Sequence, residues 1–157
     1  MASETLELRQ AVAADAAAIR ALTREAYAKW VPLIGREPVP MSVDYDEALR
    51  KNRFDLLFVD GKPAALIETI AQPDGLLIEN LAVSPRFQGR GFGRKLMAHA
   101  EKLATSLGCG QVRLYTNKLF AENLSFYRRL GYRLDSEEPF RGGWRVNMSK
   151  AVGAERR

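Results

Sequence analysis

Cysteine and histidine are nearly missing from this sequence, which holds only Cys109 and His99 of these two types in 157 residues. A single cysteine excludes an internal disulfide, and one residue of each type is too few for the ligand sets of zinc sites. A Ser-His-Asp triad would depend on His99, which lies inside a predicted helix. We therefore expect no metal, and we interpret Cys109 as a packing or surface residue and His99 as a structural one.

Long apolar runs are absent as well. The first ten residues, MASETLELRQ, lack the apolar core of a signal peptide, and no run approaches the length of a membrane span. The apolar content of 46% and charged content of 27% are those of an ordinary soluble globular protein. We expect a single domain over residues 1–150 with a short disordered tail over 151–157. We also expect a cytoplasmic protein that does not bind membranes.

Acidic residues are missing from one particular stretch, residues 84–100. It begins SPRFQGRGFGRKL, in which three glycines alternate with basic and aromatic residues before a helical pattern starts. A cation beside a helix N-terminus is unfavourable by about 0.3–1 kcal/mol, so these cations indicate an anionic ligand. Glycine-rich backbone followed by a helix N-terminus is a common phosphate cradle. The net charge of +5 also suits nucleic acid, or an Arg-rich surface without a ligand.

Two named phosphate motifs do not fit this loop. The dinucleotide fingerprint requires G-x-G-x-x-G and an acid after the next strand, whereas the chain has G-R-G-F-G and the strand QVRLYTN. The nucleotide P-loop requires Gly-Lys followed by Ser or Thr, and here Gly93 is followed by Arg94, Lys95 and Leu96. The ligand must therefore be bound in another way.

Hydrophobic periodicity and turn residues predict alternating strands and helices. We expect Asp15 to cap the first helix, and Pro32, Pro38 and Pro40 to keep the following segment irregular. The unit over residues 76–116 should be a parallel, right-handed crossover, with the glycine loop at its strand–helix junction. The predicted strands are 5–10, 53–59, 62–71, 75–83, 111–117, 131–135 and 143–151, and the predicted helices are 12–30, 45–52, 96–107 and 119–130.

Two motifs in this order resemble those of the GNAT (GCN-related) N-acetyltransferase superfamily. QGRGFG, residues 88–93, is similar to the family's Q/R-x-x-G-x-G/A signature, and ENLSFYRRLGY is similar to its second signature. The resemblance covers nearly the whole chain. It implies an α/β (α+β) fold, with a central mixed, mostly antiparallel sheet, a β-α-β coenzyme A-binding unit and about four flanking helices. It also implies acetyl-CoA as the cofactor, with no metal.

The same resemblance assigns cofactor contacts position by position. The glycine loop would hold the coenzyme's pyrophosphate, the strand before it would pair with the pantetheine arm, and Asn123 would contact that arm. A backbone N–H near Val83 would stabilise the oxyanion. Which cation meets the 3′-phosphate stays open. The expected cofactor-binding residues are Leu81, Ala82, Val83, Gln88, Gly89, Arg90, Gly91, Phe92, Gly93, Arg94, Asn123 and Tyr127.

Acetyl transfer to an amine also requires a base for the amine and an acid for the departing thiolate. Tyr127 matches the family's general acid, and Asn123 lies four residues earlier on the same helical face. A strand glutamate beside the cofactor edge is the expected base, for which we choose Glu79, with Glu68 and water as alternatives. Either glutamate could instead face solvent, and Tyr127 could belong to the helix's apolar stripe.

The acceptor is the least determined partner. Relatives shape their acceptor pocket in the part of the fold that AYAKWVPLIGREPVPMSVDY, residues 26–45, occupies here. We predict acceptor contacts from Trp30, Arg36, Met41 and Tyr45, with Arg36 pairing with an acceptor carboxylate and the aromatic rings forming an apolar wall. A small primary amine is the expected acceptor, and a protein N-terminus or lysine is the alternative.

A different class of function must be weighed beside the enzyme. A non-catalytic acyl-CoA-binding module could use the same fold, and it would bind the cofactor without releasing thiol. A nucleic-acid binder would show steeply salt-dependent affinity for duplexes, but no nucleic-acid motif is recognised and we expect no such partner. A homodimer is possible, because relatives often dimerise.

Overall fold

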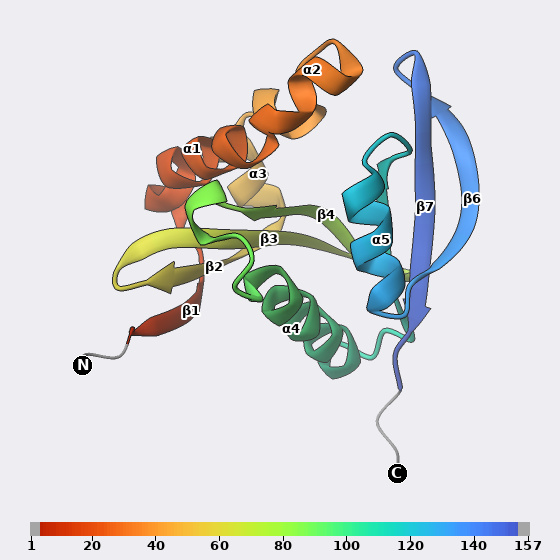
Figure 1. The fold of residues 1–157 in the computed structure, drawn as a ribbon. Coiled ribbons are helices and arrows are strands. Elements are labelled where there is room, and N and C mark those ends of the chain that lie inside the picture. Colours follow the sequence, from red (N-terminus) through yellow and green to blue (C-terminus); the bar gives the residue numbers. More distant parts are fainter. Residues whose placement is uncertain (1–3, 154–157) are drawn as a thin grey trace. The chain divides into compact units, whose positions relative to one another are not determined.

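The computed structural model describes residues 4–153, and its strands form a seven-stranded sheet in the order β1-β2-β3-β4-β5-β7-β6 (Figure 1). β4 and β5 are parallel, whereas the pairs β1–β2, β2–β3, β5–β7 and β6–β7 are antiparallel. The predicted mixed, mostly antiparallel sheet is therefore confirmed. The strands are β1 (Leu6–Gln10), β2 (Arg53–Val59), β3 (Lys62–Gln72), β4 (Gly75–Val83), β5 (Gln111–Asn117), β6 (Arg133–Phe140) and β7 (Gly143–Ala151).

The four predicted helices correspond to α1 (Ala16–Tyr27), α3 (Tyr45–Lys51), α4 (Phe92–Ser106) and α5 (Ala121–Arg129). A further single-turn helix, α2 (Val31–Ile34), follows α1. Short 3-10 turns complete the chain: η1 (Ala13–Asp15), η2 (Ala28–Trp30), η3 (Val39–Ser42) and η4 (Pro85–Phe87). Both the predicted fold class and the parallel β4-α4-β5 crossover are confirmed. No helix within residues 4–153 combines the length and apolar character needed to cross a bilayer.

The described chain forms two compact units, and it passes between them within β3, β4 and α4. The first unit comprises residues 4–69 and 80–97, and the second comprises residues 70–79 and 98–153. That residues 1–150 act as one domain stays a prediction.

The core of the first unit forms where α1 and α3 pack against β2. On α1 the buried residues Ile19, Leu22 and Ala26 recur at helical spacing and so share one face. Tyr45 of α3 meets Phe54 of β2 edge-on, with ring centroids 5.9 Å apart. Burying a side chain of this size contributes about 1.5–3 kcal/mol, so these rings fix α3 against the sheet.

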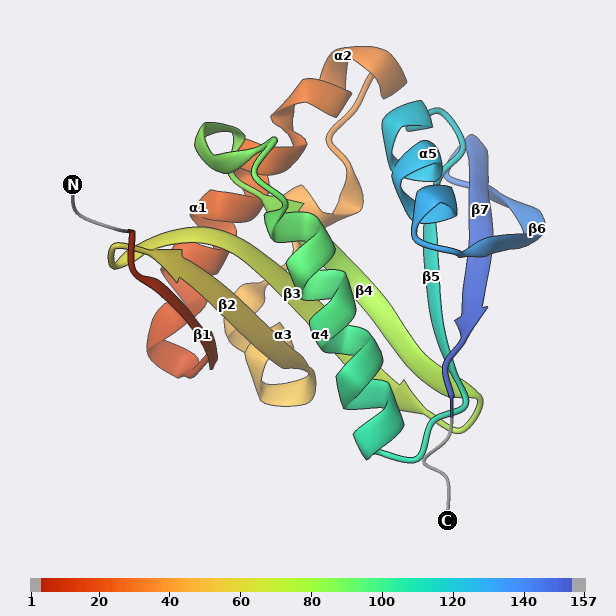
Figure 2. The same ribbon diagram turned by 60° about the horizontal axis from the view of Figure 1, so that its bottom comes forward.

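The second unit is built on β5, β7 and β6, with α5 beside β5 and β7 in both Figure 1 and Figure 2. Along β5, Val112 and Leu114 are buried and alternate with the half-buried Arg113 and Tyr115. Successive strand residues point to opposite faces, so Arg113 and Tyr115 share the face opposite to Val112 and Leu114. This alternation gives the second unit one polar sheet face.

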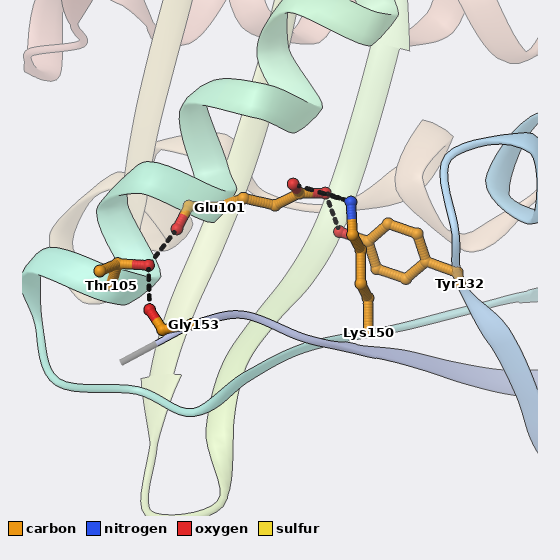
Figure 3. A network of polar contacts seen from close by, with 5 residues as sticks. All are labelled: Glu101, Thr105, Tyr132, Lys150 and Gly153. Carbon is orange, nitrogen blue, oxygen red and sulfur yellow. Dashed lines mark hydrogen bonds and ion pairs between the residues drawn. The ribbon is translucent and has the colours of Figure 1, made fainter. Parts of the chain in front are cut away.

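A polar network centred on Glu101 joins α4 to β7 and to Tyr132, the residue before β6 (Figure 3). Lys150 Nζ lies 3.0 and 3.2 Å from the two carboxylate oxygens of Glu101, and the Tyr132 hydroxyl donates to Oε2 at 2.9 Å. Thr105 Oγ1 lies 3.2 Å from the Glu101 carbonyl oxygen and 3.4 Å from that of Gly153. The network therefore ties the end of the described chain to α4.

The predicted tail begins inside regular structure. Ala151 is the last residue of β7, and the Val152 N–H donates to the Gly110 carbonyl at 3.0 Å. Residues 154–157 of the predicted tail lie outside the described residues.

Several local predictions were wrong for identifiable reasons. Pro32 lies in the first turn of α2, where its missing N–H removes no helical hydrogen bond, so this proline does not prevent a helix. Asp15 does not cap α1, because its carboxylate accepts the Val12 N–H at 2.8 Å and pairs with Arg9 at 3.0 Å. β6 extends to Phe140 rather than ending at 135, and Pro139 is tolerated because β6 is an edge strand.

Candidate functional site

The glycine loop has the backbone geometry of a ligand cradle. Gly89 and Gly91 have φ values of +77° and +82°, which residues with a side chain rarely adopt. A Cβ atom added at either position would meet nothing within 4 Å, so the space beside this backbone is open. The first bond of α4 runs from the Lys95 N–H to the Gly91 carbonyl at 3.0 Å. The N–H groups of a helix's first turn lack intrahelical acceptors, which leaves them available to an anion.

The cations of this loop differ in how firmly they are held. The Arg90 guanidinium lies 5.7 Å from the Phe87 ring centroid and 5.2 Å from that of Phe92, and it pairs with Glu4. Arg94 and Lys95 are exposed at the start of α4. Gln88 Nε2 donates to the Val83 carbonyl at 3.2 Å, which folds the loop back on the end of β4. Because no acid lies in the first turn of α4, the predicted loop suits a phosphorylated ligand.

Ser84 anchors the loop at the end of β4. The residue is fully buried, its N–H donates to the Ala64 carbonyl at 2.9 Å, and its hydroxyl donates to Glu25 Oε1 at 2.8 Å. Arg86 lies 3.7 Å from the same carboxylate. Glu25 could not be predicted as a partner, because nothing in the sequence indicates that a helical residue 59 positions away contacts Ser84.

β4, the strand before the glycine loop, pairs with β5 along only part of its length. The β4–β5 ladder covers only Leu76–Ile78 against Val112–Leu114, although β4 continues to Val83. Beyond it, Ala82 is buried and Leu81 and Val83 are half-buried. The Tyr27 hydroxyl donates to Asn80 Oδ1 at 2.7 Å and lies 3.3 Å from the Leu81 carbonyl oxygen. Tyr27 thus braces the part of β4 that was predicted to pair with the pantetheine arm, a role that the sequence did not indicate.

Glu79 directly follows the last ladder position of β4. The Tyr115 hydroxyl donates to Glu79 Oε2 at 3.0 Å. The Arg145 guanidinium lies over the ring of the same tyrosine, 4.3 Å from its centroid. Burial raises the pKa of Glu79, while the Tyr115 hydrogen bond and the Arg145 charge act in the opposite direction. A carboxyl group with a raised pKa, held by one hydrogen bond, has the properties of a general base.

The alternative base, Glu68, lies in a different setting. It belongs to β3 in the first unit, it is 4% exposed, and it accepts a hydrogen bond from Asn52 Nδ2 at 2.8 Å. This partner comes from the residue that ends α3, so Glu68 helps to fix the α3–β2 connection. Glu79 is the more accessible of the two carboxylates, since it is half-buried.

Tyr127 is buried on α5, with its ring edge-on to that of Tyr132 at 6.1 Å. Its backbone carbonyl accepts the Tyr132 N–H at 3.0 Å, so the two tyrosines contact each other through both their rings and their backbones. Burial raises the pKa of Tyr127 far above its ordinary value, and the phenol therefore stays protonated at neutral pH. Asn123 is half-buried one helical turn earlier, as their spacing predicts.

The predicted acceptor residues are mostly engaged in packing. Met41 and Tyr45 are 5% and 1% exposed, and the Tyr45 hydroxyl donates to the Pro40 carbonyl at 2.6 Å. Trp30 is buried at 9%, with Lys29 Nζ 4.8 Å from its ring centroid. Arg36 is half-buried and donates to the Glu37 carbonyl at 3.2 Å. Arg36 therefore presents more polar surface than the three buried residues.

A cavity of about 400 Å³ lies on the polar sheet face of the second unit. No single stretch of the sequence indicates this cavity, because its walls come from β3, β4, β5, β6 and β7. The lining includes Leu77, Arg113, Tyr115, Glu138, Arg145 and Asn147.

Metal ligands are not gathered anywhere in residues 4–153, where no group of three or more His, Cys, Asp or Glu side chains could hold an ion. Cys109 is half-buried and unpaired with any other cysteine, and His99 is half-buried on α4.

Comparison with known proteins points to one family. A model described as the acetyltransferase (GNAT) family matches residues 17–132. Mouse N-alpha-acetyltransferase 80 is 39% identical over 79 residues, which cover 50% of this chain and 23% of the mouse protein. Streptothricin acetyltransferase from Streptomyces lavendulae is 39% identical over 57 residues, which cover 36% of this chain and 30% of that enzyme. The chain thus spans less than a third of the length of either relative.

Solved structures match over nearly the full length. PaiA N-acetyltransferase from Thermoplasma acidophilum, in complex with coenzyme A, has a TM-score of 0.81 at 20% identity, covering 94% of this chain and 99% of that one. The ribosomal-protein-S18-alanine N-acetyltransferase from Escherichia coli has a TM-score of 0.78 at 19% identity, covering 96% of each chain. At these identities the likeness concerns the fold.

Proposed function

Since this chain belongs to the acetyltransferase (GNAT) family, we propose that it transfers the acetyl group of acetyl-CoA to a primary amine by direct attack in a ternary complex. The observation that carries the proposal is the loop over residues 88–95. There Gly89 and Gly91 leave open space beside the backbone, and the helix that follows has cations but no acid in its first turn.

The proposed roles of this loop follow from its chemistry. When bound, acetyl-CoA supplies an activated acetyl thioester. The backbone N–H groups at the start of α4 would bind its diphosphate, with Arg90 and Arg94 contributing charge. The likeness to a fold neighbour that binds coenzyme A supports this assignment. We assign Leu81, Ala82 and Val83 to the pantetheine arm, because the β4–β5 ladder ends before them.

Two side chains would move the protons. Glu79 Oε2 would accept the proton of the incoming amine, directly or through water, and its raised pKa makes it a stronger base than an ordinary carboxylate. The Tyr127 hydroxyl would give its proton to the departing thiolate, and its burial keeps it protonated until then. Asn123 would hold the coenzyme arm one turn away on the same helix.

A small-molecule amine is the acceptor that we favour. Among the relatives, streptothricin acetyltransferase is named for a small molecule, whereas N-alpha-acetyltransferase 80 is named for an α-amino group. The second unit of this chain offers a polar cavity of about 400 Å³, which is the volume of a site for a small ligand.

Turnover with a panel of primary amines tests the proposal. Free thiol would be measured together with the mass of each acetylated product, using acetyl-CoA and the full chain. We expect amine-dependent thiol release with a matching mass increase for at least one small amine. Coenzyme A binding without amine-dependent release for any amine, including a peptide N-terminus and lysine, would identify a binding module instead.

A further inference from the structure

The polar cavity of the second unit contains an arginine in an unusual position. The Arg145 guanidinium contacts two aromatic rings, 4.3 Å from the Tyr115 ring centroid and 5.1 Å from that of Phe140. Contacts with two aromatic rings restrict the orientation of a guanidinium while its N–H groups stay available as donors. Arg145 lines the cavity and keeps 27% of its side chain exposed, although its Nε atom is buried.

The hydrogen-bonding capacity of Arg145 is largely unused. Its ion-pair partner is Glu138, whose Oε1 lies 3.3 Å from Nε, and its charge also acts on Glu79. That contact is an ion pair without hydrogen-bond geometry, and Nε has no hydrogen-bond partner in the described chain. Arg113, the other arginine of the cavity, is instead engaged by Gln72 at 3.0 Å and by Asp74 at 3.3 Å. Arg145 is therefore the cation that can receive a ligand.

Tyr115 connects this arginine to the proposed base. Its ring supports the Arg145 guanidinium, and its hydroxyl donates to Glu79 Oε2 at 3.0 Å. A cation that could bind a carboxylate and a carboxylate that could accept a proton thus contact one tyrosine side chain, the first at its ring and the second at its hydroxyl. A compact molecule that carries both an amine and a carboxylate would match this arrangement.

From this juxtaposition we propose that the acceptor is a small amino acid whose carboxylate is bound by Arg145 while its amine meets Glu79. The inference rests on the proposed function and names its substrate class. It also transfers the role of carboxylate partner from Arg36 to Arg145. A monoanionic carboxylate fits better than a phosphate dianion, because the Glu138 carboxylate beside Arg145 repels a second negative charge more strongly.

The test compares each amino acid with its own primary amide. Calorimetry in the presence of coenzyme A would measure the affinity of the full chain for amino acids from glycine to 6-aminohexanoate and for the matching amides. A charge-assisted bidentate contact predicts that at least one free acid binds about ten- to a hundred-fold more tightly than its amide. In Arg145→Gln this preference should fall to about one, and Arg145→Lys should retain part of it.

A second variant keeps the proposal testable if Arg145→Gln does not fold. Glu138→Gln removes the competing charge but keeps an oxygen acceptor for the Asn147 amide, which lies 3.1 Å away. We expect it to tighten acid binding several-fold. Glu137→Gln makes the same change of charge at an exposed position on β6 outside the cavity lining, and it should leave acid binding unchanged.

The outcomes separate this inference from the proposed function. Wild-type protein without preference for any acid, a preference that survives in Arg145→Gln, or unchanged binding in Glu138→Gln would overturn the role of Arg145. Thiol release measured on the same samples tests acetyl transfer. Release with amides and acids alike would contradict only the inference, whereas acid-selective binding without any release would contradict only the transfer.

Discussion

The hydroxyl of Tyr115 on β5 lies 3.0 Å from Oε2 of Glu79 on β4, one residue beyond the last paired position of the parallel ladder. The strands stop exchanging backbone hydrogen bonds at Ile78 and Leu114, and the next side chains meet instead. This hydrogen bond holds a carboxylate whose burial raises its pKa. It therefore links the end of the ladder to the proposed proton acceptor.

The pH dependence of turnover should report on that pair. A base acts only when ionised, so the rate should fall as the pH drops through the raised pKa of Glu79. Tyr115→Phe removes a hydrogen bond that lowers this pKa, and the acidic limb of kcat/KM should move to higher pH. Glu79→Gln should lower kcat by about 10²- to 10⁴-fold and abolish the limb. A Glu79→Gln enzyme with unchanged turnover and pH profile would exclude Glu79 as the base.

The raised pKa of Glu79 also predicts how the free energy of unfolding changes with pH. A carboxyl whose pKa is raised in the folded state binds its proton more tightly there than in the unfolded chain. Its contribution to the free energy of unfolding is therefore complete below the unfolded pKa and is lost as the pH rises through the raised folded pKa. Denaturant unfolding of wild type and Glu79→Gln across this range should show the loss in wild type alone. A difference between them that does not vary with pH would contradict the raised pKa.

A substitution in the glycine loop should lower both stability and coenzyme A affinity, whereas a matched substitution elsewhere should lower stability alone. Gly91→Ala places a side chain at φ +82°, which should cost about 1–2 kcal/mol of unfolding free energy, and it should weaken coenzyme A binding by crowding the cradle. Gly108→Ala is the matched control, because Gly108 has φ +80° and equally open surroundings at the far end of α4. It should lose similar stability with coenzyme A affinity unchanged. Equal losses of affinity in both variants would refute a special role for the loop.

Tyr127→Phe should lower kcat by about 10²- to 10⁴-fold, since the thiolate would leave without a general acid. Burial raises the pKa of Tyr127, so wild type should show no basic limb from this group up to about pH 10. Tyr132→Phe serves as the control, because it removes a neighbouring hydroxyl that donates to Glu101 and leaves Tyr127 intact. If the two variants lose the same activity, Tyr127 is a packing residue rather than the acid.

The Glu101 network makes a prediction about stability alone. Glu101→Gln leaves the Lys150 ammonium, which is 31% exposed, without its carboxylate, and it weakens the acceptor for Tyr132. We expect a loss of about 1–2 kcal/mol in chemical denaturation, a figure reduced for partial solvent exposure. Glu47→Gln breaks a more exposed pair with Lys51 and should cost roughly 0.5 kcal/mol or less. Equal losses would show that the network adds nothing beyond a surface ion pair.

Most of the fold was predictable from local signals. Alternation and turn residues located the strands, and the spacing of apolar residues located α1, α4 and α5. A short helix was also predicted at the place of α3. The errors arose where a residue's effect depends on its position in an element. Pro32 stops a helix only when it lies beyond the first turn, and the Asp15 carboxylate accepts the Val12 N–H before η1 rather than an N–H of α1. Neither condition can be read from the residue alone.

The site was predictable to the extent that it is local in the sequence. The positive φ values of Gly89 and Gly91 agree with the glycine spacing, because only a left-handed backbone requires that residue type. By contrast, the cavity around Arg145 and the bond from Tyr115 to Glu79 depend on the register of strands that are distant in sequence. That register cannot be derived from a single sequence, so Arg145 was not predicted as a site residue.

Kinetics with acetyl-CoA and acetyl-pantetheine would test the central claim most directly, because both carry the same thioester and only the first carries the diphosphate. The account predicts acetyl transfer to an amine with kcat/KM at least about a hundred-fold higher for acetyl-CoA, and a smaller difference in Gly91→Ala. Equal kcat/KM values for the two donors, or no transfer from either, would contradict it.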